Sequence, residues 1–231
     1  MSDTVLEISN LKKDFTNKRR NVSVLRDITF QIKRGLFYSI EGDSGSGKST
    51  LLSILAGLRK PDAGKVVFFK DDEEIDITLK EDEYLSDLRR HDIAYISQFQ
   101  DVIPGLTVEE NIKLVDVFDG EKPSESRKET YEDILHELGI EELQNEYPEY
   151  LSGGELRRLI IARTIYAEPK VILADEPTND LDEDNRRVIL KLLKKLTEKG
   201  ITVVTVTHES QVREYADECL ELKNGVIGKC Y

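Results

Sequence analysis

Three stretches of the chain are almost continuously apolar: residues 93–97 (IAYIS), 171–175 (VILAD) and 201–208 (ITVVTVTH). Strands buried on both faces of a parallel sheet have this composition, because helices cover both sides of such a sheet. Segments with helical periodicity separate the three runs. The pattern therefore predicts an α/β fold built on a largely parallel sheet.

The N-terminal quarter of the chain predicts a different group of elements. Short strands, forming an antiparallel β layer, are expected at residues 4–9, 24–32 and 36–41. From Lys48 to Leu58 apolar residues recur at helical spacing, and turn-forming residues follow. A strand, a loop and a helix are thus expected in succession around residue 48.

Between Val108 and Tyr150 the pattern becomes helical and strongly charged, which predicts an inserted helical lobe. We therefore expect one domain, whose core with its β layer comprises residues 1–98 and 160–231 and whose helical subdomain comprises residues 99–159. The acidic run from Lys70 to Glu83 is expected to be a solvated surface segment.

Composition narrows the possible partners and location. The formal net charge of −13 repels nucleic acid and anionic lipid surfaces, so no nucleic-acid partner is expected. No stretch approaches the roughly 20 apolar residues of a membrane-spanning helix, and the N-terminus lacks a signal-peptide pattern. Cys219 and Cys230 form no CxxC pair. A soluble, reduced, cytoplasmic protein is the expectation.

The segment GDSGSGKST follows one predicted strand and opens a predicted helix, as a phosphate-binding loop must. Its glycines let backbone N–H groups surround a phosphate chain, and the helix N-terminus adds positive charge. Lys48 is the candidate catalytic cation on the outer phosphates, and the Ser49 hydroxyl is a candidate Mg²⁺ ligand. The predicted nucleotide-binding residues are Gly42, Asp43, Ser44, Gly45, Ser46, Gly47, Lys48, Ser49 and Thr50.

The segment VILADE delivers two carboxylates at the C-terminal end of a buried strand, where ligands bind in open α/β sheets. Asp175 is expected to hold Mg²⁺ through water. Glu176 is expected to orient and deprotonate an attacking water molecule, as a general base. A solvated strand-to-loop junction is the alternative for these acids taken alone.

With LSGGE at 151–155 preceding this strand, essentially the whole chain resembles the ATP-binding cassette family. The resemblance implies a RecA-like P-loop NTPase core with an antiparallel β layer and an inserted helical subdomain. It also implies ATP hydrolysis to ADP and phosphate coupled to transport, with ATP and Mg²⁺ as cofactors.

In that family the LSGG segment binds the γ-phosphate of a nucleotide held by the opposite subunit. The residues that this resemblance assigns to it are Ser152, Gly153, Gly154 and Glu155. Taken alone, the tetrapeptide could be a helix N-cap. Because each motif occurs once in the chain, one copy cannot complete either half-site, and a head-to-tail homodimer is expected.

Three further features occur in the family's expected order: Gln98, the run from Asn179 to Asp182, and His208. By resemblance, Gln98 would ligate Mg²⁺, Asp182 would fix a dimer-interface loop, and His208 would contact the γ-phosphate as a catalytic residue. Phe15 would stack on adenine, although a core aromatic is an equal alternative. Taken singly, Gln98 would be an ordinary surface amide and His208 an ordinary structural residue.

The runs LRRHDIAYISQ, PGLTVEENI and YPEYLSGGE are similar to cassettes of the macrolide-export, lipoprotein-release and cell-division group. This similarity implies that the chain acts at the cytoplasmic face of the cell membrane, bound to a separate integral membrane permease. It also implies that the complex exports lipid-linked or peptide cargo or transmits force.

Two positions depart from the group's usual pattern: Glu155 replaces a common Gln, and Asn179-Asp180 replaces Gly-Asn. The second departure is nearer to a non-transport cassette that clamps a ribosome or DNA, which is the alternative function. A cassette that signals through its membrane partner without transport is a third possibility.

Overall fold

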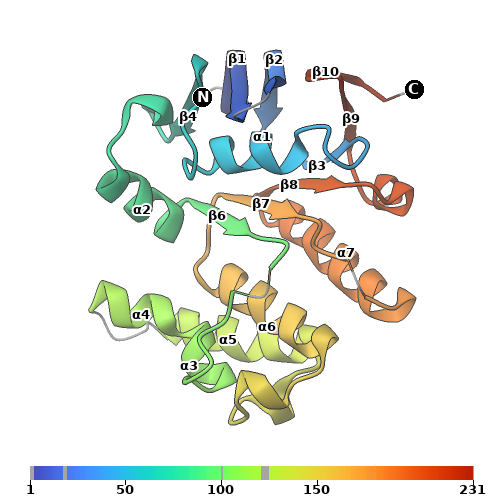
Figure 1. Cartoon of the computed structure of the whole chain (residues 1–231). Helices are drawn as coiled ribbons and strands as arrows, with labels where there is room; N and C mark the ends of the chain where they lie inside the picture. The colour runs from blue at the N-terminus through green and yellow to red at the C-terminus, as the bar shows by residue number, and fades with distance from the viewer. Residues whose placement is uncertain (1–2, 18–19, 100, 121–124, 180, 231) are drawn as a thin grey trace.

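A six-stranded sheet forms the centre of the molecule (Figure 1). The computed structural model describes residues 3–17, 20–99, 101–120, 125–179 and 181–230. The strand order is β10 (Val226–Lys229), β9 (Glu218–Lys223), β3 (Phe37–Glu41), β8 (Thr202–Thr207), β7 (Val171–Asp175) and β6 (Ile93–Ile96). Neighbouring strands are parallel except β10, which is antiparallel to β9. The three apolar runs thus lie side by side as β6, β7 and β8, as predicted.

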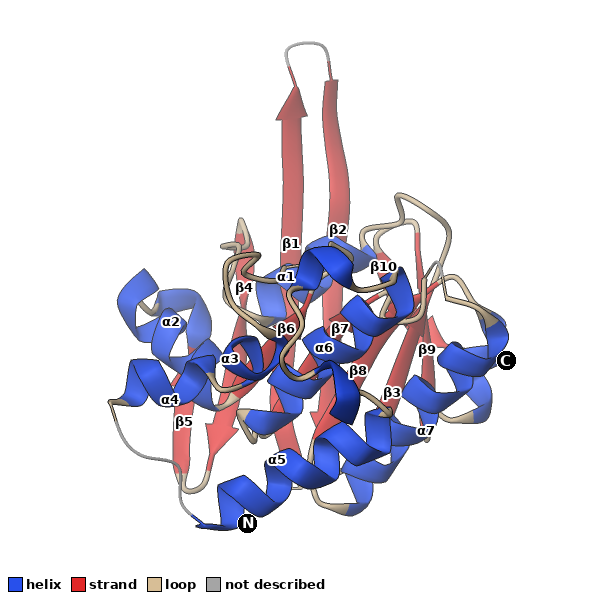
Figure 2. Ribbon diagram, turned by 90° about the horizontal axis from the view of Figure 1, so that it is seen from below, coloured by secondary structure: helices blue, strands red, loops and turns tan. Residues whose placement is uncertain are grey.

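A second, antiparallel sheet covers one side of this centre. Its order is β2 (Arg20–Lys33), β1 (Thr4–Asn17), β4 (Ala63–Lys70) and β5 (Glu73–Asp76). The helix α1 (Lys48–Leu55) packs between the two sheets (Figure 1). Strands β1 and β2 form a long ribbon that extends beyond the rest of the molecule (Figure 2). The predicted β layer is therefore present, with much longer strands than expected for residues 4–9 and 24–32. The expected strand at 36–41 was wrongly placed in this layer, because β3 pairs in parallel with β8 and β9 in the central sheet.

The opposite side of the central sheet is covered by α6 (Gly153–Tyr166) and α7 (Glu183–Glu198). Next to α6 lies the helical lobe, with α3 (Val108–Ile112), α4 (Leu114–Asp119) and α5 (Glu125–Leu138) (Figure 1). The predicted boundary near residue 160 lies within α6, which runs continuously from the lobe to the sheet. No helix among the described residues has the length and apolar composition that crossing a bilayer requires.

The remaining elements are short or peripheral. Helix α2 (Asp82–His91) precedes β6, and single 3₁₀ turns occur at Ile77–Leu79, Glu141–Leu143, Pro148–Tyr150 and Ser210–Glu214. The acidic run from Lys70 to Glu83 was expected to be a solvated segment, and this was wrong for its middle part. Ile75, which pairs with Phe68 across β4 and β5, and Ile77 are both buried, so two apolar side chains of the run reach the core.

The expectation of reduced cysteines is also corrected. Cys219 and Cys230 are joined by a disulfide bond, with their Cα atoms 5.4 Å apart. Strands β9 and β10 form an antiparallel hairpin in which Leu220 pairs with Lys229, so the next position places the two cysteines opposite each other. Spacing along the sequence did not indicate this hairpin.

Candidate functional site

The phosphate-binding loop connects the end of β3 to the start of α1. Gly47 has a φ of 106°, a left-handed conformation that favours glycine, and a Cβ there would lie 2.8 Å from Val24. The buried Lys48 ammonium donates to the carbonyl oxygens of Gly42 (2.6 Å) and Asp43 (3.1 Å). Lys48 therefore stabilises the curved loop, and its charge lies where outer phosphates would bind.

A buried carboxylate lies beside this loop at the end of β7. The Ser49 hydroxyl donates to Oδ1 of Asp175 at 3.0 Å, and the Tyr95 hydroxyl donates to Oδ2 at 3.4 Å. Burial raises the pKa of Asp175, although the hydrogen bond from Ser49 acts in the opposite direction. These hard oxygen donors, together with a buried acid in need of a counter-charge, fit Mg²⁺.

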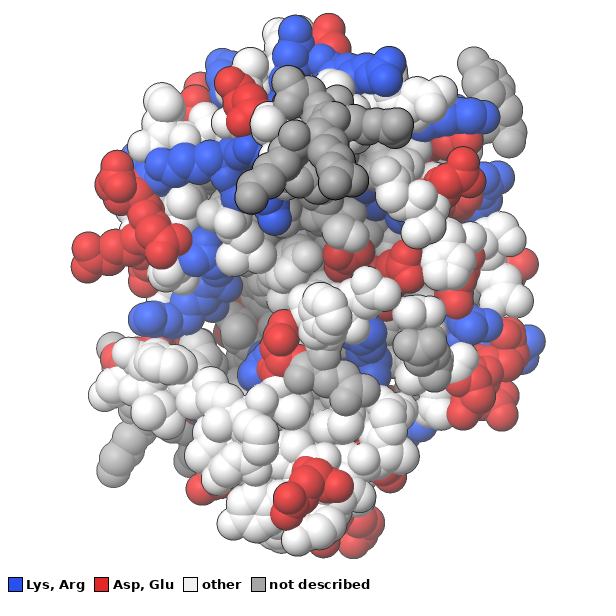
Figure 3. All heavy atoms as spheres, in the orientation of Figure 1, with Lys and Arg blue, Asp and Glu red and all other residues white. Residues whose placement is uncertain are grey.

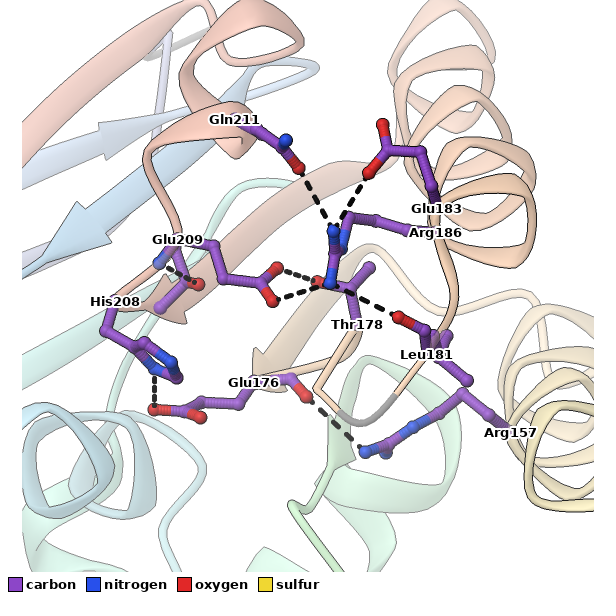
Figure 4. A network of polar contacts seen from close by, with 10 residues as sticks. Arg157, Glu176, Thr178, Leu181, Glu183, Arg186, His208, Glu209 and Gln211 are labelled. Carbon is purple, nitrogen blue, oxygen red and sulfur yellow. Dashed lines mark hydrogen bonds and ion pairs between the residues drawn. The ribbon is translucent and has the colours of Figure 1, made fainter.

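Glu176 follows directly, with its backbone in a left-handed conformation at φ 48°. Such a conformation is rare for a residue with a side chain and persists where the surroundings hold it. The Glu176 N–H donates to the carbonyl oxygen of Val206 at 3.0 Å. The Glu176 carboxylate lies 3.1 Å from Nδ1 of His208 (Figure 4). The sequence-predicted pair of catalytic residues is thus brought together from β7 and β8.

Arg157, which the sequence analysis did not single out, connects α6 to these loops. Its buried guanidinium donates to the carbonyl oxygens of Ser97 (3.0 Å), Gln98 (3.5 Å) and Glu176 (3.4 Å). Lysine and arginine side chains on a helix usually extend into water. Because this guanidinium instead donates to three carbonyl oxygens in two loops, it fixes the positions of those loops. The residue after β6 and the residue after β7 are therefore held by one side chain.

These elements surround a pocket of about 830 Å³. Figure 3 shows the face of Figure 1, where side chains of both charge signs are interspersed. Most of the predicted nucleotide-site residues line the pocket: Gly42, Asp43, Ser44, Gly45, Gly47, Lys48, Ser49, Thr50, Gln98, Glu176 and His208. Ser46 and Asp175 belong to the same loop and strand end without being part of the lining.

The LSGGE segment does not line this pocket. Ser152 is the N-cap of α6, and its hydroxyl accepts from the Glu155 N–H while the Glu155 carboxylate accepts from the Ser152 N–H. The Ser152 hydroxyl also donates to the Glu155 carboxylate at 2.7 Å, and this hydrogen bond, followed by the one from the Ser152 N–H, lowers the pKa of Glu155. Gly153 and Gly154 form the first turn of the helix. Asp182 caps α7, accepting from the Asn185 N–H at 2.8 Å, and Asp180 lies outside the described residues.

Phe15 lies on β1 and is partly exposed, outside the pocket lining. The Arg59 guanidinium lies 5.1 Å and the Lys13 ammonium 5.8 Å from the centre of its ring. The ring is therefore not a core aromatic, and cations lie against it.

The pocket also contains residues to which the sequence analysis assigned no role in the site, namely Val24, Glu41, Asn179, Arg213 and Glu221. The Glu41 carboxylate is buried and accepts two hydrogen bonds from Arg213, both at 2.6 Å. For Glu41 the sequence did contain a signal, namely an acid at the end of an otherwise largely apolar strand (FYSIE). Its partner comes from a 3₁₀ turn far along the chain and carried no signal.

Comparison with known proteins gives concordant matches. The protein-family model described as ABC transporter matches residues 25–179 of the chain. The chain is 40% identical over 226 residues to the lipoprotein-releasing system ATP-binding protein LolD of Aquifex aeolicus (strain VF5), covering 97% of each chain. It is 37% identical to the macrolide export ATP-binding/permease protein MacB of Vibrio parahaemolyticus, covering 98% of this chain and 34% of MacB.

A solved structure has the same fold. It is the dimeric, post-hydrolysis state of the ATP-binding cassette MJ0796 bound to ADP and Pi. The TM-score is 0.86 at 36% sequence identity, with 97% of this chain and 98% of that chain covered.

Proposed function

We propose that this chain, which belongs to the ABC transporter family and is one of its ATPases, forms a head-to-tail dimer that drives a separate permease. The family and the RecA-like α/β fold class predicted from the sequence are confirmed. The observation that carries the proposal is the separation of the two motifs. The phosphate loop lines the pocket and Ser152–Glu155 does not, so a second copy must supply the LSGGE segment.

The pocket residues have distinct roles in this proposal. Backbone N–H groups from Gly42 to Thr50 surround the phosphates of ATP, and Lys48 neutralises the outer ones. Ser49, Gln98 and Asp175 would hold Mg²⁺. The bound ion would neutralise charge that develops on the transferred phosphoryl group.

Hydrolysis itself depends on two side chains. Glu176 accepts a proton from the attacking water and orients it toward the γ-phosphorus atom, while His208 contacts the γ-phosphate. The distance of 3.1 Å between the two side chains supports this arrangement, because both then face the same position in the pocket. Loss of the γ-phosphate removes the group that joins the two subunits, and the dimer opens.

The partner copy contributes Ser152, Gly153, Gly154 and Glu155, and the N-terminus of its α6 is directed at the γ-phosphate. Asp182 fixes the interface loop at the start of α7. Phe15 stacks on adenine with one face, and the cations that lie against its ring support its use as an aromatic platform.

The permease contacts the segment from Gln98 to Leu114 and the neighbouring helix α4. The large apolar side chains Phe99, Val117 and Phe118 are exposed there, with Phe99 77% exposed. The relatives LolD and MacB are named for lipoprotein release and for macrolide export. Export or mechanotransmission of lipid-linked or peptide cargo at the cytoplasmic face of the membrane is therefore proposed.

The test uses the Glu176→Gln variant. With ATP and Mg²⁺ it is expected to bind nucleotide, hydrolyse it very slowly and form a stable dimer in light scattering. Lys48→Ala is the matched control, which is expected to lose tight ATP binding and to remain monomeric. A Glu176→Gln protein that stays monomeric with bound ATP would contradict the dimer.

The same variant identifies the partner. Affinity purification from detergent-solubilised membranes with ATP is expected to recover a membrane protein with few helices, and the Lys48→Ala control is not. Recovery of ribosomal or DNA-associated proteins instead would favour the clamp function.

A further inference from the structure

A second set of polar contacts lies next to Glu176 and His208 (Figure 4). Thr178, two residues after Glu176, donates its hydroxyl proton to Oε2 of Glu209 at 2.9 Å. Glu209 directly follows His208. The loops after β7 and β8 are therefore joined twice, once by the catalytic pair and once by the contact between Thr178 and Glu209.

Glu209 is held from two further sides. Its N–H donates to the Thr207 hydroxyl at 2.9 Å, and its Oε1 lies 3.0 Å from Nη2 of Arg186. Thr178 is 1% exposed. The Glu209 and Arg186 side chains are 18% and 19% exposed. Because water is largely excluded, these charge-assisted contacts define the geometry more strongly than surface contacts do.

Arg186 extends the network to the start of α7. Its Nη2 also donates to the carbonyl oxygen of Leu181 at 3.2 Å, and its Nη1 donates to Gln211 at 3.1 Å (Figure 4). Leu181 directly precedes Asp182, the N-cap of α7. One guanidinium thus connects the residue next to His208 with the segment that leads to Asp182.

We propose that Thr178, Glu209 and Arg186 are positioning residues, which hold Glu176 and His208 at their working separation and link it to the segment before Asp182. This inference rests on the proposed function, which gives Glu176 and His208 their roles. None of the three positioning residues lines the nucleotide pocket. Their effect on turnover must therefore pass through other residues.

The backbone of Glu176 explains why such support is needed. Its left-handed conformation persists only where neighbouring structure holds it. A misplacement of about 1 Å in a reacting group can lower a rate by roughly 100-fold. Nucleotide affinity depends instead on the phosphate loop and Lys48, which these contacts do not touch. Loss of the network should lower kcat and leave nucleotide binding unchanged.

The experiment compares Thr178→Val and Arg186→Met with Arg187→Met. Arg187 is the neighbour on the same helix, 60% exposed, and pairs with Glu183 at the surface. For Thr178→Val and Arg186→Met, kcat of the ATPase is expected to fall by about tenfold or more, with the Kd for a fluorescent ATP analogue within about twofold. Arg187→Met should match the parent protein in both.

Conservative variants separate positioning from folding. Thr178→Ser keeps the hydroxyl group, and its kcat should recover to near the parent value. If Arg186→Met does not fold, the comparison of Thr178→Val with Thr178→Ser, both checked by thermal unfolding, decides the question. A fall of kcat and affinity together, in proportion to Tm, would overturn the positioning role.

Glu176→Gln is measured in the same assay as the reference. If it loses turnover while Thr178→Val and Arg186→Met turn over like Arg187→Met, the inference fails and the proposed function stands. If Glu176→Gln itself retains turnover, the assigned role of Glu176 fails, and the inference fails with it.

Discussion

The hydroxyl of Ser49, at the start of α1, lies 3.0 Å from Oδ1 of Asp175, at the end of β7. The phosphate loop and the acidic strand end are therefore joined directly. Since Asp175 is buried, its negative charge is unfavourable until a cation compensates it.

Asp175→Asn is expected to raise the Tm of the nucleotide-free, Mg²⁺-free protein at neutral pH and to abolish ATPase activity. Burial raises the pKa of Asp175, so its charged form lowers stability at high pH, and this penalty disappears as pH falls through that pKa. The Tm difference between variant and parent should therefore shrink under acidic conditions. Calorimetry across pH checks it, and an equal or lower Tm of the variant at neutral pH would contradict it.

Glu155→Gln is expected to strengthen the ATP-dependent dimer. The lowered pKa of Glu155 keeps it ionised at the N-terminus of α6, where the partner's γ-phosphate must approach in the proposed dimer. Gln keeps an oxygen that can accept from the Ser152 N–H and removes the charge. A roughly tenfold lower dimer dissociation constant, about 1.4 kcal/mol, is expected in a Glu176→Gln background.

Salt provides the control for this prediction. Because the effect is electrostatic, the difference in dimer dissociation constant with and without the Glu155→Gln substitution should diminish as ionic strength rises in analytical ultracentrifugation. A difference that does not respond to salt would point to a change in packing at the helix N-terminus.

Asn111→Asp is expected to destabilise the segment that precedes α3. The fully buried Asn111 accepts from the Ile103 N–H and donates to the carbonyl oxygens of Ile103, Leu106 and Thr107. A carboxylate of the same shape cannot donate to them, and its charge is buried, so a loss of about 3 kcal/mol is expected. Urea unfolding measures it, and faster hydrogen exchange between residues 101 and 110 should accompany it.

Reduction of the bond between Cys219 and Cys230 is expected to lower the Tm. For a separation of 11 residues the chain-entropy estimate is about 3 kcal/mol, or roughly 5 to 10 °C in Tm. Differential scanning calorimetry with and without a thiol reductant measures the change. The Cys219→Ser/Cys230→Ser variant should resemble the reduced protein and should not respond to reductant.

The phosphate loop and the acidic strand end could be predicted because local sequence determines them. A glycine-rich turn before an apolar helix has few alternative conformations, and VILAD is apolar enough to require full burial. The length of β1 was missed because register shifts between Ile8 and Asp14 interrupt its alternation of apolar and polar residues.

Side-chain contacts between distant segments could not be predicted. Arg157 donates to the Ser97 carbonyl, and Thr178 donates to Glu209, across separations of 60 and 31 residues. Arginine, threonine and glutamate also occur throughout ordinary protein surfaces, so their types carried no signal. The proposed catalytic pair, Glu176 and His208, was predicted from a motif and from the family resemblance, and the contacts that hold it were not.

Arg157 lies on the second turn of the helix that Ser152 caps. In the proposed dimer, Ser152 at one end of this helical segment contacts the ATP bound by the neighbouring copy. Arg157 at the other end contacts the carbonyl oxygens of the chain's own Gln98 and Glu176. About one turn of rigid helix leaves little freedom of movement between them. In each copy, nucleotide bound in the neighbour's pocket would therefore affect the position of Gln98 and Glu176 in the chain's own pocket. The two hydrolysis events in a dimer should then not be statistically independent.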